Sequence, residues 1–219
     1  MASRYDEIAF FKISARYVVD IMKAHKSEED LDILDVACGT DNVVLECAKC
    51  MPGSSFEGID ILEGMLAKAT ANAKELHLDN VTFHLQDITK LGIRKKYDVI
   101  TCAYALFFLP EAHKVLSGLL KCLKPEGRVI FTSFLPKAFT PSTDILLPLL
   151  EKYGSTSAKE YESDKWENLK QTKDIEYLCA LAGVKNVNIQ AKEIRYAHVT
   201  GCVSMNGGNS LIIRVTKGC

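Results

Sequence analysis

The sequence lacks an excess of charge of either sign, and it lacks long apolar runs. Its 219 residues include 27 Lys and Arg against 28 Asp and Glu, so the formal net charge is −1 at pH 7. Such a balance provides no electrostatic surface for nucleic acid or for an anionic membrane. The longest largely apolar stretch, residues 99–109, is far shorter than the roughly 20 residues of a membrane span. We therefore expect neither a nucleic-acid partner nor a membrane span.

An uninterrupted apolar signal segment is also missing, because charged residues are mixed into the first 17 positions. This predicts a cytoplasmic protein whose eight cysteines are reduced. Cys47 and Cys50 are spaced as a C-x-x-C pair inside an apparent helix, but no second pair stands at zinc spacing. The five histidines show no i, i+4 ligand pairing. We predict packing roles for the two cysteines and no metal site.

Short apolar segments alternate with helical patterns over the first ~130 residues. Alternation of this kind is typical of α/β proteins with parallel, buried strands. We predict a Rossmann-like, doubly wound sheet of about seven strands, mostly parallel, with an antiparallel C-terminal hairpin strand. Such sheets bind ligands beyond the carboxyl ends of their strands. The expected strands are 31–36, 55–60, 81–86, 97–102 and 128–134, and the expected helices are 4–24, 42–51, 63–76 and 111–123.

The regular pattern loosens after the fifth expected strand. Residues 153–168 are polar and poorly periodic, and residues 136–170 are predicted to form an insertion or lid. We expect one domain over residues 1–219, with residues 1–30 as a helical cap at its N-terminus. Three prolines punctuate this part of the chain: Pro136, Pro141 and Pro148.

The C-terminal segment returns to recognisable elements. A helix is expected over 172–182, with Thr172 as its N-cap and Gly183 as its stop. The sequence Asn-Gly-Gly-Asn at 206–209 predicts a hairpin turn. The strands that this turn would join are 187–196 and 210–216.

The segment Leu-Asp-Val-Ala-Cys-Gly-Thr-Asp, residues 34–41, directly follows the first expected strand and opens a helix. Gly39 in this turn allows the backbone to approach a bound cofactor closely. Asp60 ends the second strand, where a carboxylate can accept hydrogen bonds from ribose hydroxyls. Asp87 follows the third strand and can reach an exocyclic amine such as adenine N6. Together these features predict a site for an adenosine-bearing cofactor.

Asp41 helps to decide which of the adenosine-containing cofactors the loop suits. A dinucleotide places its pyrophosphate at a helix N-terminus, where the Asp41 carboxylate would compete with the phosphate. S-adenosylmethionine has no phosphate and carries an ammonium and a sulfonium. An acidic loop therefore favours S-adenosylmethionine, by the ~0–1 kcal/mol that an exposed charge pair is worth. Alternatively, Asp41 is simply a favourable charge at a helix N-terminus.

The chain resembles the class I S-adenosylmethionine-dependent methyltransferases, in the joint order and spacing of five segments. These segments are LDVACGT (34–40), GIDILEGMLAKA (58–69), VTFHLQDI (81–88), YDVITCAYALFFLP (97–110) and LLKCLKPEGRVIFTSF (119–134). The resemblance implies S-adenosyl-L-methionine as cofactor and methyl transfer to a small-molecule acceptor. The sequence departs from the family at Ala37 and Asp41, which replace the first and third loop glycines.

The resemblance also implies which residues contact the cofactor. The loop would cradle the methionine moiety, Asp60 would bind the ribose, and Asp87 with Ile88 would meet the adenine edge. The implied cofactor-binding residues are Asp35, Ala37, Cys38, Gly39, Asp60, Ile61, Met65, Asp87, Ile88, Ala103 and Tyr104. The candidate acceptor-pocket residues are Tyr5, Tyr17, Phe108 and His198. Candidates for a general base are His198, His113 and Tyr104.

Other interpretations stay open at this point. The four aspartates could be ordinary turn or helix caps, and the aromatic residues could be core. The chain could be a non-catalytic cofactor-binding protein, an inactive partner subunit or a protein-directed methyltransferase. An NAD-dependent oxidoreductase is a further alternative, although no Tyr-x-x-x-Lys pair marks a hydride site. The oligomeric state is open between monomer and homodimer.

Overall fold

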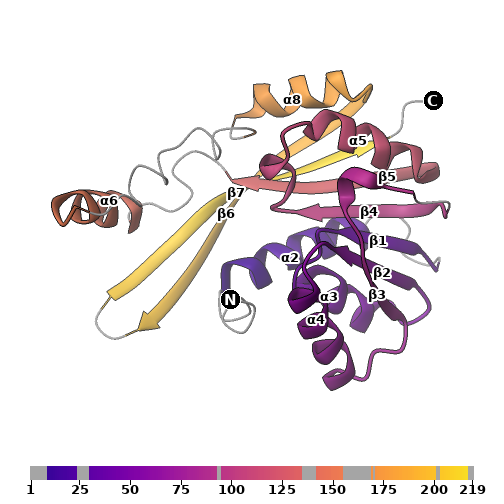
Figure 1. Ribbon diagram of the computed structural model, residues 1–219, viewed down its shortest axis with the longest axis horizontal. Helices are drawn as coiled ribbons and strands as arrows, with labels where there is room; N and C mark the ends of the chain where they lie inside the picture. Colours follow the sequence, from indigo (N-terminus) through magenta and orange to yellow (C-terminus); the bar gives the residue numbers. More distant parts are fainter. Residues whose placement is uncertain are drawn as a thin grey trace.

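In the computed structural model, seven strands form one sheet in the order β3-β2-β1-β4-β5-β7-β6 (Figure 1). The strands are β1 Asp32–Val36, β2 Ser55–Asp60, β3 Val81–Leu85, β4 Tyr97–Ala103, β5 Leu123–Phe134, β6 Asn186–Thr200 and β7 Val203–Thr216. The structure describes residues 9–23, 30–92, 95–134, 142–154, 169, 171–200 and 203–216.

Strands β1 to β5 are parallel, and β7 is antiparallel to both β5 and β6. The predicted α/β architecture is thus confirmed, including the antiparallel C-terminal hairpin. The chain runs from β1 outward to β3 and then returns to place β4 on the other side of β1. This reversal is the switch point at which open α/β sheets bind ligands.

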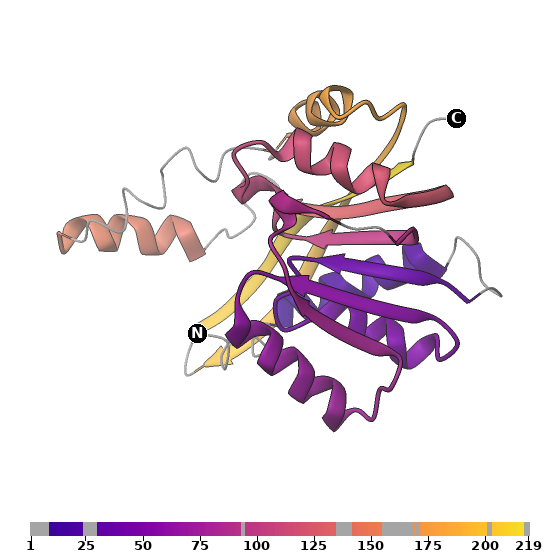
Figure 2. The same ribbon diagram turned by 45° about the vertical axis from the view of Figure 1, so that its right-hand side comes forward.

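Helices cover both faces of the sheet (Figures 1 and 2). Neighbouring residues of a strand point to opposite faces. Ile33 of β1 therefore packs in one core with α2 and α3, whereas Leu34 packs in a second core with α5 and α8. Helix α4 packs along β2 and β3. The bounds are α2 Ala9–Lys23, α3 Asn42–Cys50, α4 Glu63–Glu75, α5 Ala112–Lys121 and α8 Thr172–Leu181.

A close approach of β2 to its neighbours explains one glycine. A Cβ placed on Gly58 would lie 2.7 Å from a ring carbon of Phe83 and 3.0 Å from the Cys38 sulfur. Such distances are too short for a side chain without displacing its neighbours. Gly58 therefore allows the Phe83 ring on β3 and the Cys38 side chain in the loop after β1 to pack directly against β2.

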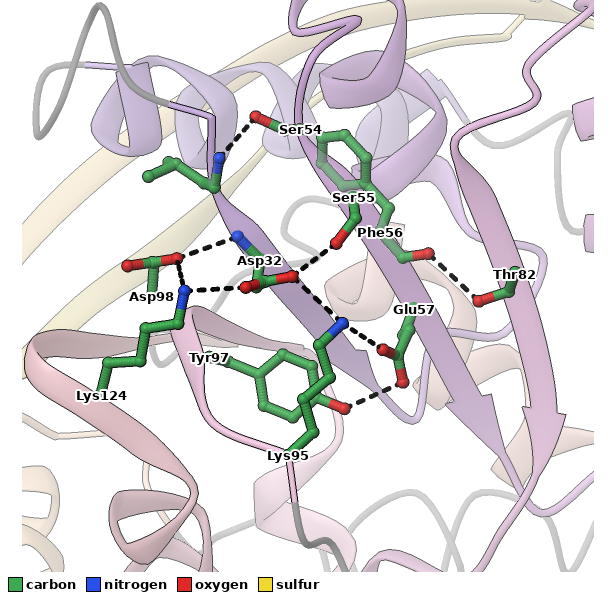
Figure 3. Close-up of polar contacts among 11 residues, drawn as sticks. Asp32, Ser54, Ser55, Phe56, Glu57, Thr82, Lys95, Tyr97, Asp98 and Lys124 are labelled. Atoms are coloured by element: carbon green, nitrogen blue, oxygen red, sulfur yellow. Dashed lines mark hydrogen bonds and ion pairs between the residues drawn. The ribbon is translucent and has the colours of Figure 1, made fainter.

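An ion-pair network lies around the amino ends of β1 and β4 (Figure 3). The ammonium of Lys124 is 2.7 Å from a carboxylate oxygen of both Asp32 and Asp98. Lys95 lies 3.1 Å from Asp32 and 2.7 Å from Glu57. Hydrogen bonds from Lys124 and Ser55 hold the pKa of Asp32 well below its usual range. Each acid here has a cation beside it.

The C-terminal ribbon differs from the predicted hairpin. The turn expected at 206–209 is wrong, because these residues lie inside β7, where Asn206 pairs with Ala197 and Gly208 pairs with Ile194. A register shift between Ile194 and Ala197 accommodates this segment. Glycine within a strand commonly marks such an irregularity. The ribbon extends beyond Phe134, the last residue of β5, past the carboxyl edge of the sheet (Figure 1).

One local prediction needs correction, and one segment contains a helix that was not predicted. The N-cap of α8 is Gln171 rather than Thr172, because the side chains of Gln171 and Asp174 form a reciprocal capping box. The segment predicted as an insertion at 136–170 contains a helix, α6 (Ser142–Lys152), which carries Pro148 in its interior. The internal proline masked its helical pattern, since proline usually ends a helix. Residues 136–141, 155–168 and 170 of this segment lie outside the described residues.

Gly183 follows α8 as predicted, with φ of +81° and its N–H donating to the carbonyl of Ala180. None of the helices in the described ranges is long and apolar enough to cross a membrane.

Candidate functional site

The loop between β1 and α3 has an unusual backbone. Ala37, Gly39 and Asp41 have φ values of 54°, 59° and 65°. Glycine adopts this left-handed region freely, whereas a residue with a Cβ is destabilised there by roughly 1–2 kcal/mol. Two of the three positions therefore store strain. Strain of this kind persists where the surrounding structure enforces it, and it concentrates at functional sites.

Hydrogen bonds from β2 hold this loop in place. The backbone N–H of Cys38 donates to the carbonyl of Ile59 at 3.0 Å, and that of Gly39 donates to Asp60 Oδ2 at 2.9 Å. The other carboxylate oxygen of Asp60 accepts the N–H of Leu62 at 2.9 Å. Asp60 thus joins the loop to the start of α4. Its oxygens retain lone pairs, so its contact with a ribose stays a prediction.

Two further acids, Asp35 and Asp41, lie buried beneath the loop. Asp35 accepts a hydrogen bond of 2.5 Å from the Thr101 hydroxyl on β4. Asp41 caps α3, because its Oδ1 accepts the N–H of Val44 at 3.0 Å. The Asp41 side chain is 0% exposed, and its Oδ2 is buried with no hydrogen-bond partner in the part of the chain described.

This burial corrects the expectation for Asp41. The sequence predicts a charge on an accessible loop, but the structure encloses the carboxyl within the fold. The interpretation as a helix-terminal group is confirmed, since Asp41 is the N-cap. The acid that lines the cleft itself is Asp35. Nonlocal packing decides this difference, so local sequence does not reveal it.

Burial sets the electrostatics of the pair. Removal from water raises the pKa of Asp35 to about 7, aided by the nearby charge of Asp60 and opposed by the Thr101 hydrogen bond. Burial also raises the pKa of Asp41 well above its usual range, and the charge of Asp35 adds to the effect. Across the described residues, neither carboxyl has a lysine or arginine partner.

A cleft opens above this loop. Its walls come from α2, from the loop after β1, and from the end of β4. Across it, the hydroxyls of Ser14 and Tyr104 are 2.6 Å apart. No lysine, arginine or histidine of the described chain lines the cleft, whereas the carboxyl of Asp35 does. The cleft therefore suits a neutral or cationic ligand better than an anionic one.

Aromatic side chains form the wall beside the end of β4. Tyr104 has φ of 53°, and its N–H donates to the Thr132 hydroxyl at 3.0 Å. Its ring stacks on Phe134 with a centroid distance of 4.5 Å. Phe108, in the short η2 turn Leu106–Phe108, is 56% exposed, although the preceding Phe107 is buried. This wall offers an apolar surface to a ligand.

Apolar side chains also lie exposed beside Asp60. Ile61 is 64% exposed, and Met65 and Ile88 are half-buried. Asp87 caps the short η1 turn Ile88–Lys90 by accepting the N–H and hydroxyl of Thr89. These hydrogen bonds lower the pKa of Asp87. The capping interpretation of Asp87 is confirmed, and its contact with adenine stays a prediction.

The other predicted site residues are distributed as follows. Ala37, Cys38, Gly39, Ala103 and Tyr104 line the cleft with Asp35. Tyr17 does not line it, and its ring lies 5.6 Å from the Lys192 ammonium. His113 lies on α5 and does not line the cleft either. Tyr5 and the side chain of His198 lie outside the described residues.

Sequence reasoning missed several contributors to the site, among them Phe11, Ser14 and Thr101. Thr101 lies inside a recognised strand, but its partner Asp35 is 66 positions away. Ser14 is 90 positions from Tyr104. The only signal for Ser14 is its place on a predicted amphipathic helix, which does not identify a partner.

The chain is similar to known proteins over most of its length. A family model described as a methyltransferase domain matches residues 27–194. A demethylmenaquinone methyltransferase of Lactococcus lactis is 31% identical over 204 residues, which is 87% of this chain and 81% of the relative. A malonyl-[acyl-carrier protein] O-methyltransferase of Bacillus cereus is 32% identical over 140 residues, or 63% of this chain. The match spans only 51% of that relative's length.

The fold has counterparts among solved structures. Magnesium protoporphyrin IX methyltransferase of Synechocystis PCC 6803, solved with bound SAH, superimposes with a TM-score of 0.65. The two chains are 22% identical, and the superposition covers 95% of this chain and 84% of the other. At this identity the likeness establishes the shared fold.

Proposed function

The chain belongs to the methyltransferase domain family, and from this membership we propose that it binds S-adenosylmethionine at the carboxyl edge of its sheet and transfers the methyl group to a small-molecule acceptor. One observation carries the proposal. The cleft lies beside the switch point between β1 and β4, and its lining includes a carboxyl and, among the described residues, no cationic side chain.

The charge of the cleft fits this cofactor rather than a dinucleotide. S-adenosylmethionine carries an ammonium and a sulfonium, which the buried acids Asp35 and Asp41 favour. A pyrophosphate would require N–H donors or cationic side chains, and Asp41 already occupies the N-cap of α3 with its carboxyl. Nicotinamide dinucleotides are therefore the poorer fit.

Different residues at the carboxyl edge of the sheet can bind different parts of the cofactor. In this proposal the loop around Gly39 holds the methionine moiety, and Asp60 accepts hydrogen bonds from the ribose. The exposed side chain of Ile61, with Met65 and Ile88 beside it, covers the adenine. Burial of these apolar groups by the cofactor is favourable by about 25 cal/mol for each Å² removed from water.

When bound, S-adenosylmethionine supplies a methyl group on a good leaving group, so the protein needs no covalent intermediate. The chain's residues then have to position the acceptor and exclude water. Positioning can supply ~7–11 kcal/mol of barrier reduction. Helix α2 closes one side of the cleft through the hydrogen bond between Ser14 and Tyr104. The Tyr104 hydroxyl is the predicted general-base candidate that lines the cleft, and its hydrogen bond to Ser14 holds it in place.

A small acceptor accords with the aromatic wall of Tyr104, Phe134 and the exposed Phe108. The relatives are named for malonyl-[acyl-carrier protein], demethylmenaquinone and aklanonic acid. These names point to acceptors whose methylated part is a small organic group. A protein acceptor and a binding role without turnover are the alternatives that the assay below distinguishes.

The test has two stages. Calorimetric titration with S-adenosylmethionine and with S-adenosylhomocysteine (SAH) should give micromolar dissociation constants. Transfer of a radioactive methyl group is then measured against panels of small acids, phenols and quinols, with a protein extract as the competing acceptor class. Failure to bind either cofactor form would refute the proposal. If the chain binds the cofactor but transfers the methyl group only to protein, the acceptor is a protein and not a small molecule.

A further inference from the structure

Asp35 and Asp41 are two buried carboxyls that have no cationic partner among the described residues. Each carboxyl shifts the pKa of the other. Two carboxylates can share a hydrogen bond only when one of them carries a proton. The Oδ2 of Asp41 is buried and has no hydrogen-bond partner in the described chain. A proton between the two acids would satisfy it.

The remaining partners of the pair are consistent with one shared proton. Thr101 donates to Asp35 at 2.5 Å, and the Val44 N–H donates to Asp41 at 3.0 Å. Each of these bonds stabilises one oxygen and leaves the contact between the carboxyls intact. Two negative charges at this depth would each lose their hydration without gaining a cation, which is costly. One proton halves that charge.

Resting on the proposed function, we propose that Asp35 and Asp41 hold one proton between them in the free protein and release it to solvent when the cationic cofactor binds. The proton leaves a carboxyl oxygen, and the resulting negative charge faces the positive charge of the ligand. Asp35 lines the cleft, and Asp41 acts on the cofactor through Asp35. Asp41 is therefore a positioning residue that makes the site selective for a cationic ligand.

The groups that surround the pair do not provide an alternative counter-charge. Asp60, at the end of β2, contributes a further negative charge. The thiols of Cys38, Cys47 and Cys102 are buried, and burial raises the pKa of each, so they stay neutral. From α2, Lys23 lowers the pKa of Cys47, and it is not among the groups that shift the pKa of either acid. The ligand is thus the cation available to the pair.

The expected behaviour follows from proton linkage. Burial raises the pKa of both acids, so the free protein holds the proton up to near-neutral pH. Release on binding then strengthens the affinity as pH rises, by up to about tenfold per pH unit below the titration of the pair. SAH lacks the sulfonium charge, so its binding should release fewer protons than that of S-adenosylmethionine.

The experiment counts protons directly. S-adenosylmethionine is titrated into the intact chain by calorimetry at about pH 6.5, in two buffers of very different ionisation enthalpy. The difference in observed heat gives the number of protons released. We expect release approaching one proton for the wild type, together with a dissociation constant that falls between about pH 6 and pH 8.

Asp41→Asn is the informative variant. Its amide oxygen retains the bond to the Val44 N–H, and its amide N–H can donate to Asp35 in place of the shared proton. That bond favours the ionised form of Asp35, so less proton remains to be released when the ligand arrives. Proton release should fall, the pH dependence should weaken, and the affinity at about pH 6 should equal or exceed that of the wild type. A merely structural role for Asp41 would lower affinity at every pH.

Asp20→Asn provides the matched control, because Asp20 is an exposed acid on α2. It should retain the proton release of the wild type. Tight cofactor binding with no proton release by the wild type would overturn the inference while leaving the proposed function intact. Unchanged release by Asp41→Asn would overturn it as well. Absence of binding at every pH would refute the proposed function itself, and the inference with it.

Discussion

The two ends of strand β1 carry aspartates in opposite circumstances. Asp32, at the amino end, lies within reach of two lysines, and its pKa is lowered. Asp35, at the carboxyl end, is buried beside another acid and has no cationic partner among the described residues, and its pKa is raised. The two residues are three positions apart on one short strand. The fold therefore places compensated charge at one edge of the sheet and uncompensated charge at the other.

This difference separates charges that stabilise the fold from charges that await a ligand. Acids beside cations at the amino edge gain from folding, and they leave nothing for a ligand to satisfy (Figure 3). Acids at the carboxyl edge are destabilised by folding and gain when a cation arrives. Perturbed carboxyls in a cleft are typical of functional sites. The contrast supports the carboxyl edge as the cofactor site.

The pH dependence of unfolding should show the contrast most strongly. A carboxyl whose pKa is raised on folding stabilises the folded state at low pH, and that stability is lost as pH rises from about 4 to about 7. Asp32 has the opposite sign, so its contribution is present above about pH 4 and is lost on acidification. The free energy of unfolding of the cofactor-free chain, measured in urea, should fall by about 3 kcal/mol between pH 5 and pH 8. A flat profile would contradict the burial of uncompensated acid.

Asp60→Ala should weaken cofactor binding by about 1–3 kcal/mol, since it removes the acceptor for the Gly39 and Leu62 N–H groups and for the ribose. The matched change at the other edge is Asp98→Ala, which removes an acceptor for the Asp32 N–H and for Lys124. We expect that variant to lose stability but to keep its cofactor affinity. Calorimetric titration of both variants decides this, and equal affinity losses would remove the distinction between the edges.

Replacing a carboxyl by an amide at the two ends of β1 should change the stability of the cofactor-free chain in opposite directions at about pH 8. Asp35→Asn removes a buried negative charge, so the cofactor-free chain should gain about 1–2 kcal/mol while cofactor affinity falls. Asp32→Asn removes a paired charge and should cost about 1 kcal/mol without changing cofactor affinity. Thermal unfolding with and without S-adenosylmethionine measures both effects. If both substitutions destabilise the chain, the proposed difference between the two ends of β1 is wrong.

The smallest effect is expected at Lys95, whose ammonium is 2.7 Å from Glu57 and 3.1 Å from Asp32. Its side chain is partly exposed, so solvent screens the pair. Lys95→Met should cost at most about 1 kcal/mol of stability, and less at high salt. Chemical unfolding at two salt concentrations checks this, and a loss several times larger would show that the network is more than a set of surface pairs.

Local patterns in the sequence were sufficient to predict the sheet and the turn after β1. β2 begins and ends where its apolar pattern predicts, because Pro52 and Gly53 bound it on one side and Asp60 on the other. The glycine turn after β1 predicts the loop. Separately, the order of the strands predicts a ligand site at the switch point. These features depend on residues close together in the chain.

Features that depend on distant contacts were not predictable in the same way. Asp41 is 0% exposed in the fold, whereas sequence alone suggests an accessible charge. The ribbon of β6 and β7 continues through Asn206 to Asn209, because pairing across two long strands outweighs a local preference for a turn. The contact of Ser14 with Tyr104 joins residues 90 positions apart. Tertiary pairing decides each of these cases.

The central claim is that the uncompensated edge of the sheet binds a cationic, adenosine-bearing cofactor. Its most direct test is calorimetric titration of the folded chain with S-adenosylmethionine at about pH 8, with NADH titrated in parallel and Asp35→Asn as the variant. The account predicts micromolar binding of S-adenosylmethionine, weaker binding by the variant, and no binding of NADH. Binding of NADH alone, or equal S-adenosylmethionine affinity in the variant, would contradict it.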